Sequence, residues 1–364
     1  MKVVFVQSGL TAGGTEKIVN LLARHRADIG DDVHVLAFSG TRESSYFHYD
    51  DDITVSTLRN SRGRGGNPIL RVATRTIWLR QKFRLIRPDV IVSFLTKINV
   101  LALIASRGLS IPVVISERNN PRKQDAATIW QKGIELLGAC AEGVVMQTNA
   151  ARLMLSENLQ HRTFIIPNPA VNFATVKRTL GSGIRIVAVG RLAHQKGFDL
   201  LLEAFAEVAA EAPQASLTIF GEGPERDALM AQARALAIDS RVTFAGLTET
   251  PGAWLAETDI FILSSRFEGF PNVLVEALAG GVASIAFNCP WGPSDILNDG
   301  KDGLLVQPED VNALASAIRR LLNDSDLRAQ LSASAPQAVC RFNLPNVFAQ
   351  WDSVIDQVAK RKRP

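Results

Sequence analysis

Ser264-Ser-Arg-Phe-Glu-Gly-Phe-Pro-Asn-Val-Leu-Val-Glu-Ala-Leu-Ala-Gly280 is the stretch that decides the fold prediction. It follows an apolar run, Asp259 to Leu263, of the kind that forms a buried parallel strand. Pro271 suits the start of a helix because its φ is fixed and it has no N–H to pair. Apolar residues follow at helical spacing. The stretch therefore predicts a strand, a loop and a helix, which is the unit of a parallel α/β sheet.

Two carboxylates fall at the mouth of this unit. Glu268 lies in the predicted loop, and Glu276 lies in the second turn of the predicted helix, with seven residues between them. Open α/β sheets bind ligands at the carboxyl ends of their strands. The N–H groups of Gly269, Phe270 and Asn272 are free to hold an anion there. Carboxylates for hydroxyl groups beside a backbone cradle for phosphate are what a nucleotide-sugar site needs.

Glu268 and Glu276, in the setting Phe-Glu-Gly-Phe-Pro-Asn, resemble the E-x7-E motif of retaining glycosyltransferase family four. The resemblance extends over the whole chain and is strongest from residue 184 to residue 303. It implies an α/β chain of GT-B fold, with two doubly wound Rossmann-like domains that face each other across a cleft. We expect an acceptor-binding domain at 1–172, a nucleotide-sugar-binding domain at 173–342 and a helix at 343–364 that crosses back to the first domain.

A second loop carries two cations. Arg191 and Lys196 lie between a predicted strand, 184–189, and a predicted helix, 198–211. A planar guanidinium and a compact ammonium in front of a helix N-terminus suit a diphosphate. The resemblance implies that both stabilise the leaving diphosphate, that Glu268 contacts the sugar and that Glu276 binds the ribose hydroxyls. It also implies donor contacts at Gly13, Gly14, Gly190, Glu222, Leu247, Gly269, Phe270, Pro271 and Asn272.

The first domain offers two further candidate segments. Gly13-Gly14 follows a first predicted strand and allows close approach of the backbone to a ligand; Thr11 or Thr15 could cap the next helix. The segment Glu117-Arg118-Asn119 ends a later strand, where family members place a histidine beside the reacting sugar. We expect these three residues on the acceptor side, with Arg118 or Asn119 in place of the histidine.

Charge is divided unevenly along the chain. Residues 1–172 hold 22 Lys/Arg and 14 Asp/Glu, a net charge of +8, and the remainder holds 18 and 22, a net charge of −4. From Arg59 to Arg87 basic residues alternate with apolar ones, and the second part of this segment predicts a basic amphipathic helix. Such a helix lies on an anionic membrane or packs with a solvated basic face. No other feature suggests nucleic-acid binding.

Cysteine use and the absence of a long apolar run indicate a cytoplasmic protein, and the basic first domain together with the resemblance places it peripherally on the inner face of the cell membrane. No apolar run reaches the roughly 20 residues of a membrane span, and Met1 to Val6 is too short for a signal peptide. The three cysteines are far apart, which predicts reduced thiols and no metal site.

These patterns predict a metal-independent transferase, and the resemblance implies retention at the anomeric carbon. The resemblance and the basic first domain favour transfer of a hexose or N-acetylhexosamine from a UDP-linked nucleotide sugar to a polyprenyl-diphosphate-linked or lipopolysaccharide glycan. No Asp-x-Asp site and no cofactor are needed, because Arg191, Lys196 and helix N-termini supply the positive charge. A GDP-mannose-dependent mannosyltransferase is the main alternative. A GT-B nucleotide-sugar epimerase and a non-catalytic sugar-nucleotide binder are further alternatives.

Overall fold

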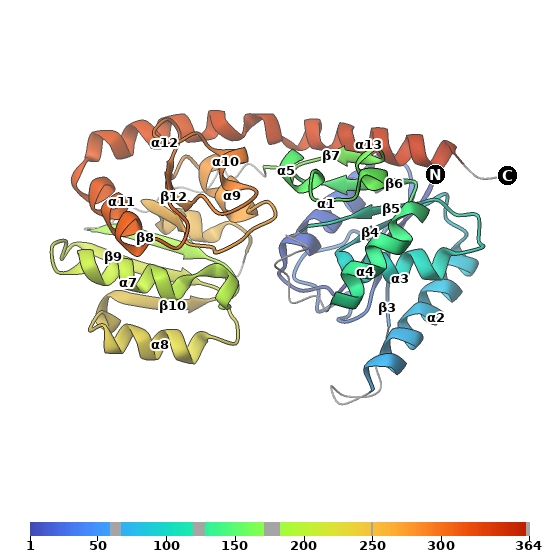
Figure 1. Cartoon of the computed structure of the whole chain (residues 1–364), viewed down its shortest axis with the longest axis horizontal. Helices are drawn as coiled ribbons and strands as arrows, with labels where there is room; N and C mark the ends of the chain where they lie inside the picture. The colour runs from blue at the N-terminus through green and yellow to red at the C-terminus, as the bar shows by residue number, and fades with distance from the viewer. Residues whose placement is uncertain (59–66, 119–127, 171–182, 249, 362–364) are drawn as a thin grey trace. The chain divides into compact units, whose positions relative to one another are not determined.

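The computed structural model describes residues 1–58, 67–118, 128–170, 183–248 and 250–361 (Figure 1). The chain forms two compact units. The first unit contains Met1–Asn168 together with Pro345–Pro364, and the second contains Pro169–Leu344. Each is built around its own parallel sheet.

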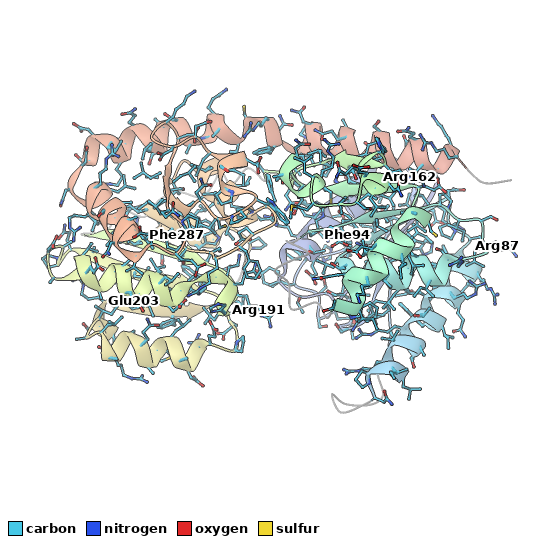
Figure 2. All side chains as sticks on the ribbon, viewed as in Figure 1. Arg87, Phe94, Arg162, Arg191, Glu203 and Phe287 are labelled. Carbon is cyan, nitrogen blue, oxygen red and sulfur yellow. The ribbon has the colours of Figure 1, made fainter. Side chains whose placement is uncertain are left out.

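The sheet of the first unit has seven strands in the order β3-β2-β1-β4-β5-β6-β7. The strands are β1 (Lys2–Gln7), β2 (Asp32–Ala37), β3 (Thr54–Thr57), β4 (Val90–Phe94), β5 (Val113–Ser116), β6 (Gly143–Met146) and β7 (Thr163–Ile165). The order reverses between β1 and β4, so the loops after these two strands flank a switch point, the usual ligand position in doubly wound sheets. Phe94, which ends β4, is fully buried (Figure 2).

Helices cover the first sheet because each carries an apolar face. They are α1 (Gly14–Asp28), α2 (Pro68–Ile86), α3 (Thr96–Ser106), α4 (Thr128–Leu137), α5 (Asn149–Arg152), α6 (Glu157–Gln160) and α13 (Leu344–Lys360), with the 3-10 turn η1 (Gly138–Cys140). The start of α2 follows from its sequence: Pro68 is at its first turn, and the Asn67 side chain accepts a hydrogen bond from the N–H of Ile69.

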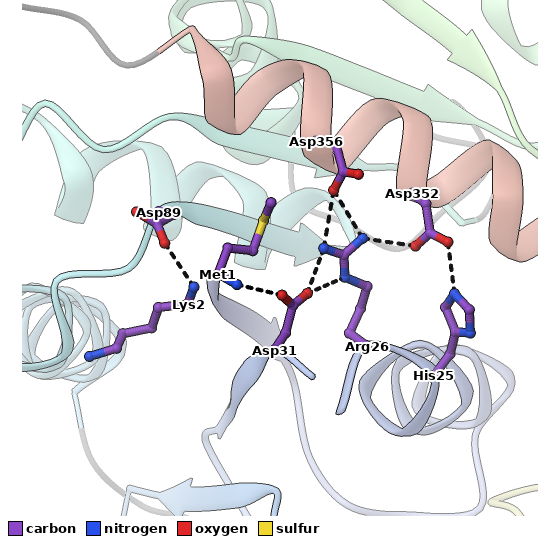
Figure 3. A network of polar contacts seen from close by, with 8 residues as sticks. All are labelled: Met1, Lys2, His25, Arg26, Asp31, Asp89, Asp352 and Asp356. Carbon is purple, nitrogen blue, oxygen red and sulfur yellow. Dashed lines mark hydrogen bonds and ion pairs between the residues drawn. The ribbon is translucent and has the colours of Figure 1, made fainter. Parts of the chain in front are cut away.

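The last helix, α13, completes the core of the first unit. Trp351 is fully buried there among side chains from β1 and β4. An ion network around the buried Arg26 ties α13 to α1 (Figure 3). In it the Arg26 guanidinium, 2% exposed, contacts Asp31 at 2.5 Å, Asp352 at 2.8 Å and Asp356 at 3.1 Å. A buried cation with three carboxylate partners holds a helix that is more than 300 residues away in sequence.

The sheet of the second unit has the order β10-β9-β8-β11-β12-β13. Its strands are β8 (Ile184–Val189), β9 (Ala215–Phe220), β10 (Val242–Gly246), β11 (Ile260–Leu263), β12 (Ala283–Phe287) and β13 (Leu304–Val306). Its helices are α7 (Phe198–Ala209), α8 (Arg226–Ala235), α9 (Asn272–Ala279), α10 (Pro293–Ile296), α11 (Val311–Asn323) and α12 (Ser325–Val339), with 3-10 turns η2 (His194–Lys196), η3 (Asp239–Arg241), η4 (Ala253–Glu257) and η5 (Cys340–Phe342). The switch point lies between β8 and β11.

The doubly wound prediction is therefore confirmed for both units, and the decisive stretch forms β11, a loop and α9. One local prediction was wrong. Neither Thr11 nor Thr15 caps α1, because its N-cap is Gly13 with no side-chain bond.

Candidate functional site

The loops after β8 and β11 meet at the switch point of the second sheet. Lys196 Nζ lies 2.6 Å from Glu268 Oε1, and the Ser265 hydroxyl donates to the same oxygen at 2.6 Å. The side chains of Lys196 and Glu268 are 18% and 7% exposed. Two predicted catalytic residues, 72 positions apart, thus form one shielded ion pair.

Backbone and side-chain hydrogen bonds hold these two loops together. Ser264 Oγ donates to the carbonyl of Lys196 at 2.9 Å, and the Arg266 N–H donates to the carbonyl of Gln195 at 2.8 Å. Gly197 has φ +61°, and a Cβ on it would lie 2.1 Å from the carbonyl oxygen of Ser264. Arg266 also binds both carboxylate oxygens of Asp199 in the first turn of α7, at 2.7 and 2.6 Å. The Lys196–Glu268 pair therefore rests on a rigid support.

Arg191 is placed differently from Lys196. Its side chain is exposed (Figure 2), and among the residues that the structure describes it has no hydrogen-bond or ion-pair partner. Its loop is fixed by backbone bonds, since Gly190 N–H donates to Phe220 O at 2.9 Å and Leu192 N–H donates to Glu222 O at 3.0 Å. A Cβ at Gly190 would contact the Lys196 side chain at 3.1 Å. Arg191 is thus a cation without a described partner on an ordered loop, next to Lys196, which is paired with Glu268.

The segment before α9 is the one predicted to form a backbone cradle. Within the described part of the chain, the N–H groups of Gly269 and Phe270 donate no hydrogen bond. The ring of Phe270 is buried edge-on against Phe342, with centroids 5.3 Å apart. Pro271 is the N-cap of α9, and Gly292 packs so close that a Cβ there would lie 2.6 Å from Pro271 Cδ. Packing on both sides therefore orders this segment.

The remaining predicted donor-binding residues of the second unit lie along the same strand-end edge of its sheet. Glu276 is on α9 and is 7% exposed, and Asn272 begins that helix. Glu222 follows β9 and pairs with Arg226 at 3.1 Å, and Leu247 follows β10 with 58% of its surface exposed. Their positions after β9 and β10 place them progressively farther from the Lys196–Glu268 pair along the sheet order.

In the first unit, the Gly13-Gly14 turn opens α1 at the switch point of the sheet. Glu16, which the sequence analysis did not single out, occupies the turn. A Cβ at Gly13 would lie 2.1 Å from Glu16 Oε2, and Ser8 Oγ donates to Glu16 Oε1 at 3.1 Å. Burial raises the pKa of Glu16. Its position in the first turn of the helix, as in a capping box, was the available sequence signal.

Glu117 lies at the carboxyl end of β5 and is 3% exposed. Thr96 Oγ1 and Asn99 Nδ2 each donate to one of its oxygens at 2.7 Å. Burial raises the pKa of Glu117 to about 7, against the pull of these two donors. This is a carboxyl group poised to change protonation near neutral pH.

Arg118 turns into the core instead of toward the surface. It donates to Asn168 Oδ1 at 2.6 Å, and its guanidinium carbon lies 5.2 and 5.3 Å from the ring centroids of Phe94 and Trp351. Burial lowers the pKa of Arg118 to about 9. Glu117 and Arg118 are therefore adjacent in sequence but have separate partners; Asn119 lies outside the described residues.

Two searches of the described residues complete the description. No group of three His, Cys, Asp or Glu side chains there has the arrangement of a metal site. Among the described helices, none has the length and apolar character needed to cross a membrane.

Two family models match the chain next to each other. The model described as glycosyl transferase 4-like domain matches residues 13–169, and the model described as glycosyl transferases group 1 matches residues 183–324. The first match covers the seven-stranded sheet and the second covers the six-stranded sheet, each with its own switch point.

Curated relatives and a solved structure agree with this. An exopolysaccharide phosphotransferase of Streptomyces coelicolor is 28% identical over all of this chain, which spans only 41% of that protein. An N-acetyl-D-galactosaminyltransferase of Campylobacter jejuni, named for a diNAcBac-PP-undecaprenol glycan acceptor, is 27% identical over 98% of this chain and 99% of its own length. The crystal structure of Anabaena HepE in complex with UDP covers 98% of this chain and 100% of its own, with a TM-score of 0.78 and 20% identity. The structural likeness confirms the GT-B fold.

Proposed function

Because this chain belongs to the glycosyltransferases that carry a group 1 domain behind a 4-like domain, we propose that it is a retaining, metal-independent hexosyl- or N-acetylhexosaminyltransferase. The donor is a UDP-sugar and the acceptor is a lipid-linked or lipopolysaccharide glycan. The observation that carries the proposal is the Lys196–Glu268 pair at 2.6 Å beside Arg191, which has no partner among the residues that the structure describes. These groups supply two cations for a diphosphate and a carboxylate for a sugar hydroxyl at one strand-end edge.

In the proposed reaction, Arg191 and Lys196 bind the donor diphosphate and stabilise the negative charge that grows on it as the bond to the sugar breaks. The acceptor oxygen forms its bond to the anomeric carbon on the same face, and its proton passes to an oxygen of the departing phosphate. Glu268 binds a hydroxyl of the sugar, and Glu276 binds the ribose hydroxyls. The N–H groups of Gly269 and Phe270, which have no acceptor among the described residues, hold a phosphate oxygen.

The relatives support the choice of substrates. HepE is described in complex with UDP, and the Campylobacter relative is named for an N-acetylhexosamine transferred to a glycan on a polyprenyl diphosphate. These names favour a UDP donor and a lipid-linked acceptor over GDP-mannose and a soluble acceptor.

Thermal shift of the purified protein tests the donor class. UDP, GDP, ADP and their common sugar conjugates are compared with and without EDTA. A ligand at about 100 times its Kd stabilises the protein by roughly 2.7 kcal/mol, which is easily measured. A shift with UDP that survives EDTA supports the proposal. A shift with GDP alone identifies a mannosyltransferase, and a UDP shift abolished by EDTA contradicts the metal-independent site.

Turnover of an Arg191→Ala variant tests the catalytic role. Loss of one preorganised charge at the reacting diphosphate costs on the order of 10²-fold in rate. Arg234→Ala is the matched control, because Arg234 is also an exposed arginine of the second unit. Unchanged turnover of Arg191→Ala would remove the residue from the mechanism.

The proposal includes docking of the first unit on the anionic inner face of the cell membrane. Helix α2 is basic and exposes Ile69 (78%), Leu70 (63%), Ile77 (57%) and Leu85 (78%). Arg59, Arg62 and Arg64 of the predicted basic segment lie outside the described residues. Exposed apolar side chains among cations suit an interfacial helix. Flotation with vesicles that does not depend on anionic lipid would contradict this part.

A further inference from the structure

Trp291, in the loop between β12 and α10, has a backbone conformation that an aromatic residue rarely adopts. Its φ is +67°, in the left-handed region, and Gly292 follows it at φ +107°. A bulky side chain in this region costs free energy and persists only where the surrounding structure enforces it. Residues of this kind are concentrated at ligand sites. The mechanism above does not use Trp291, so its strained backbone needs a separate explanation.

The loop around Trp291 is held on both sides. Before it, the N–H of Asn288 donates to the carbonyl of Val306 in β13 at 2.8 Å. After it, Arg341 Nη2 donates to the carbonyl of Asp295 in α10 at 2.6 Å. These bonds hold the loop in place, and they explain how Trp291 keeps a conformation that a free loop would relax.

This loop contacts the segment that is predicted to bind the donor phosphate. A Cβ at Gly292 would lie 2.6 Å from Pro271 Cδ and 3.5 Å from the carbonyl oxygen of Gly269, so the start of α10 lies against the start of α9 (Figure 1). The two loops also follow neighbouring parallel strands, β11 and β12, and therefore lie at the same strand-end edge. Trp291 is thus one residue away from a direct contact with the loop of Glu268.

The sheet order shows on which side of the candidate site Trp291 lies. The two cations proposed for the diphosphate, Arg191 and Lys196, follow β8. Glu268, the carboxylate proposed for the sugar, follows β11, and Trp291 follows β12. The order of these strands in the sheet is β8-β11-β12. Trp291 is therefore next to the proposed sugar carboxylate, on the side away from the diphosphate cations.

The indole of Trp291 has the properties of a sugar-binding surface. It is half-buried, and among the residues that the structure describes it has no hydrogen-bond partner and no ring contact. The C–H groups on a face of a pyranose are apolar and carry partial positive charge, so they pack against the electron-rich face of an aromatic ring. Sites for small molecules combine such apolar walls with a few polar groups. Trp291 would supply the wall and Glu268 the polar group.

We propose that Trp291 recognises the transferred sugar of the donor by packing its indole on the C–H face of the pyranose ring. The assignment rests on the proposed function and deepens it, since it separates recognition of the sugar ring from recognition of its hydroxyls and of the diphosphate. A nucleotide without a sugar has no group to make this contact. The affinity for UDP should therefore not depend on Trp291, whereas the affinity for a UDP-sugar should.

Calorimetric titration of the full-length protein tests the assignment. The probes are UDP and its glucose, galactose, N-acetylglucosamine and N-acetylgalactosamine conjugates, and the readout is the ratio of the Kd of UDP to the Kd of the conjugate that the wild type binds most tightly. Trp291→Ala is expected to raise the Kd of that conjugate about tenfold, as for loss of one aromatic packing contact, and to leave the Kd of UDP unchanged. Trp291→Phe, which keeps a ring, should recover most of the affinity. Trp130→Ala is the matched control, because Trp130 is a half-buried tryptophan of the first unit; its ratio should remain that of the wild type.

Trp291→Gly separates loss of the ring from damage to the loop. Glycine adopts a φ of +67° without strain, so this variant should melt at a higher temperature than Trp291→Ala and still lose the same affinity for the UDP-sugar. Equal weakening of UDP and UDP-sugar by the Trp291 substitutions overturns the assignment, and so does an unchanged ratio. In either case UDP binding by the wild type would leave the proposed transferase standing. A wild type that binds neither UDP nor any of the conjugates contradicts the proposed UDP-dependent transferase, and this assignment with it.

Discussion

Replacement of Glu117 by Gln should make the protein more stable at pH 8 without the same gain at pH 4.5. The carboxyl of Glu117 has a pKa of about 7 in the folded chain, above its ordinary value of 4.5, because burial disfavours its charged form. The folded state therefore keeps a proton that the unfolded state has released. The wild type loses stability as the pH rises from 4.5 through 7, and the loss is complete above 7.

The gap between 4.5 and about 7, at about 1.36 kcal/mol for each pH unit, amounts to about 3 kcal/mol. A glutamine does not titrate, and its carbonyl can accept from Asn99 while its NH₂ donates to the Thr96 hydroxyl, which rotates to accept. The variant should thus gain about 3 kcal/mol over the wild type between pH 4.5 and pH 8.

Calorimetry at pH 4.5, 6, 7 and 8 measures this difference. For a unit of this size about 3 kcal/mol corresponds to a Tm difference of roughly 6–12 °C. Glu135→Gln is the matched surface control, since Glu135 is an exposed glutamate on α4. If the Tm difference between Glu117→Gln and the wild type were the same at pH 4.5 and pH 8, the reasoning would be refuted. The buried carboxyl would then have the same pKa in the folded and the unfolded chain.

Two other predictions concern the second unit. Lys196→Met should lower its free energy of unfolding by about 3 kcal/mol, because the buried Glu268 carboxylate is left without a cation. In urea unfolding, the double variant with Glu268→Gln should recover most of that loss. If the effects of the two substitutions simply added, the two side chains would not interact directly. Gly197→Ala should lower Tm more than Gly300→Ala. Both glycines have similar positive φ, +61° and +70°, but only at Gly197 does a Cβ meet a carbonyl oxygen, whereas nothing lies within 4 Å at Gly300; equal Tm losses would mean that backbone strain alone matters.

The sequence was most informative where local rules decide the structure. The run from 259 to 280 was readable because four consecutive buried apolar residues form β11 and Pro271 stops the loop at the start of α9. The Gly-rich turn from 190 to 197 was readable for a similar reason: Gly197 has a backbone conformation that other residues rarely adopt. In both places the local sequence alone determines the local backbone structure.

Contacts between distant segments could not be predicted in the same way. Arg118 was expected on the acceptor side, and the structure places its guanidinium against Trp351 of α13. The residues around Arg118 in the sequence give no information about which side chain of α13 packs there. Glu16 was overlooked because a glutamate in the first turn of a helix is common. Only the fold shows that it is buried and that it fills the Gly13 turn.

The resting pair between Lys196 and Glu268 has a consequence for the proposed reaction. Sequence motifs assigned the lysine to the diphosphate and the glutamate to the sugar as if each were free, but in the structure each is the other's partner at 2.6 Å. A single carboxylate neutralises one charge, whereas a diphosphate carries more negative charge, and in the proposed reaction it would also be bound by Arg191 and the N–H groups before α9. We therefore expect the donor to draw the ammonium of Lys196 away from Glu268. The carboxylate, which Ser265 contacts at 2.6 Å, would then accept a hydrogen bond from a hydroxyl of the sugar. The proposed reaction would thus exchange one partner of Lys196 for another, on side chains that the structure already holds in place, instead of ordering two mobile side chains.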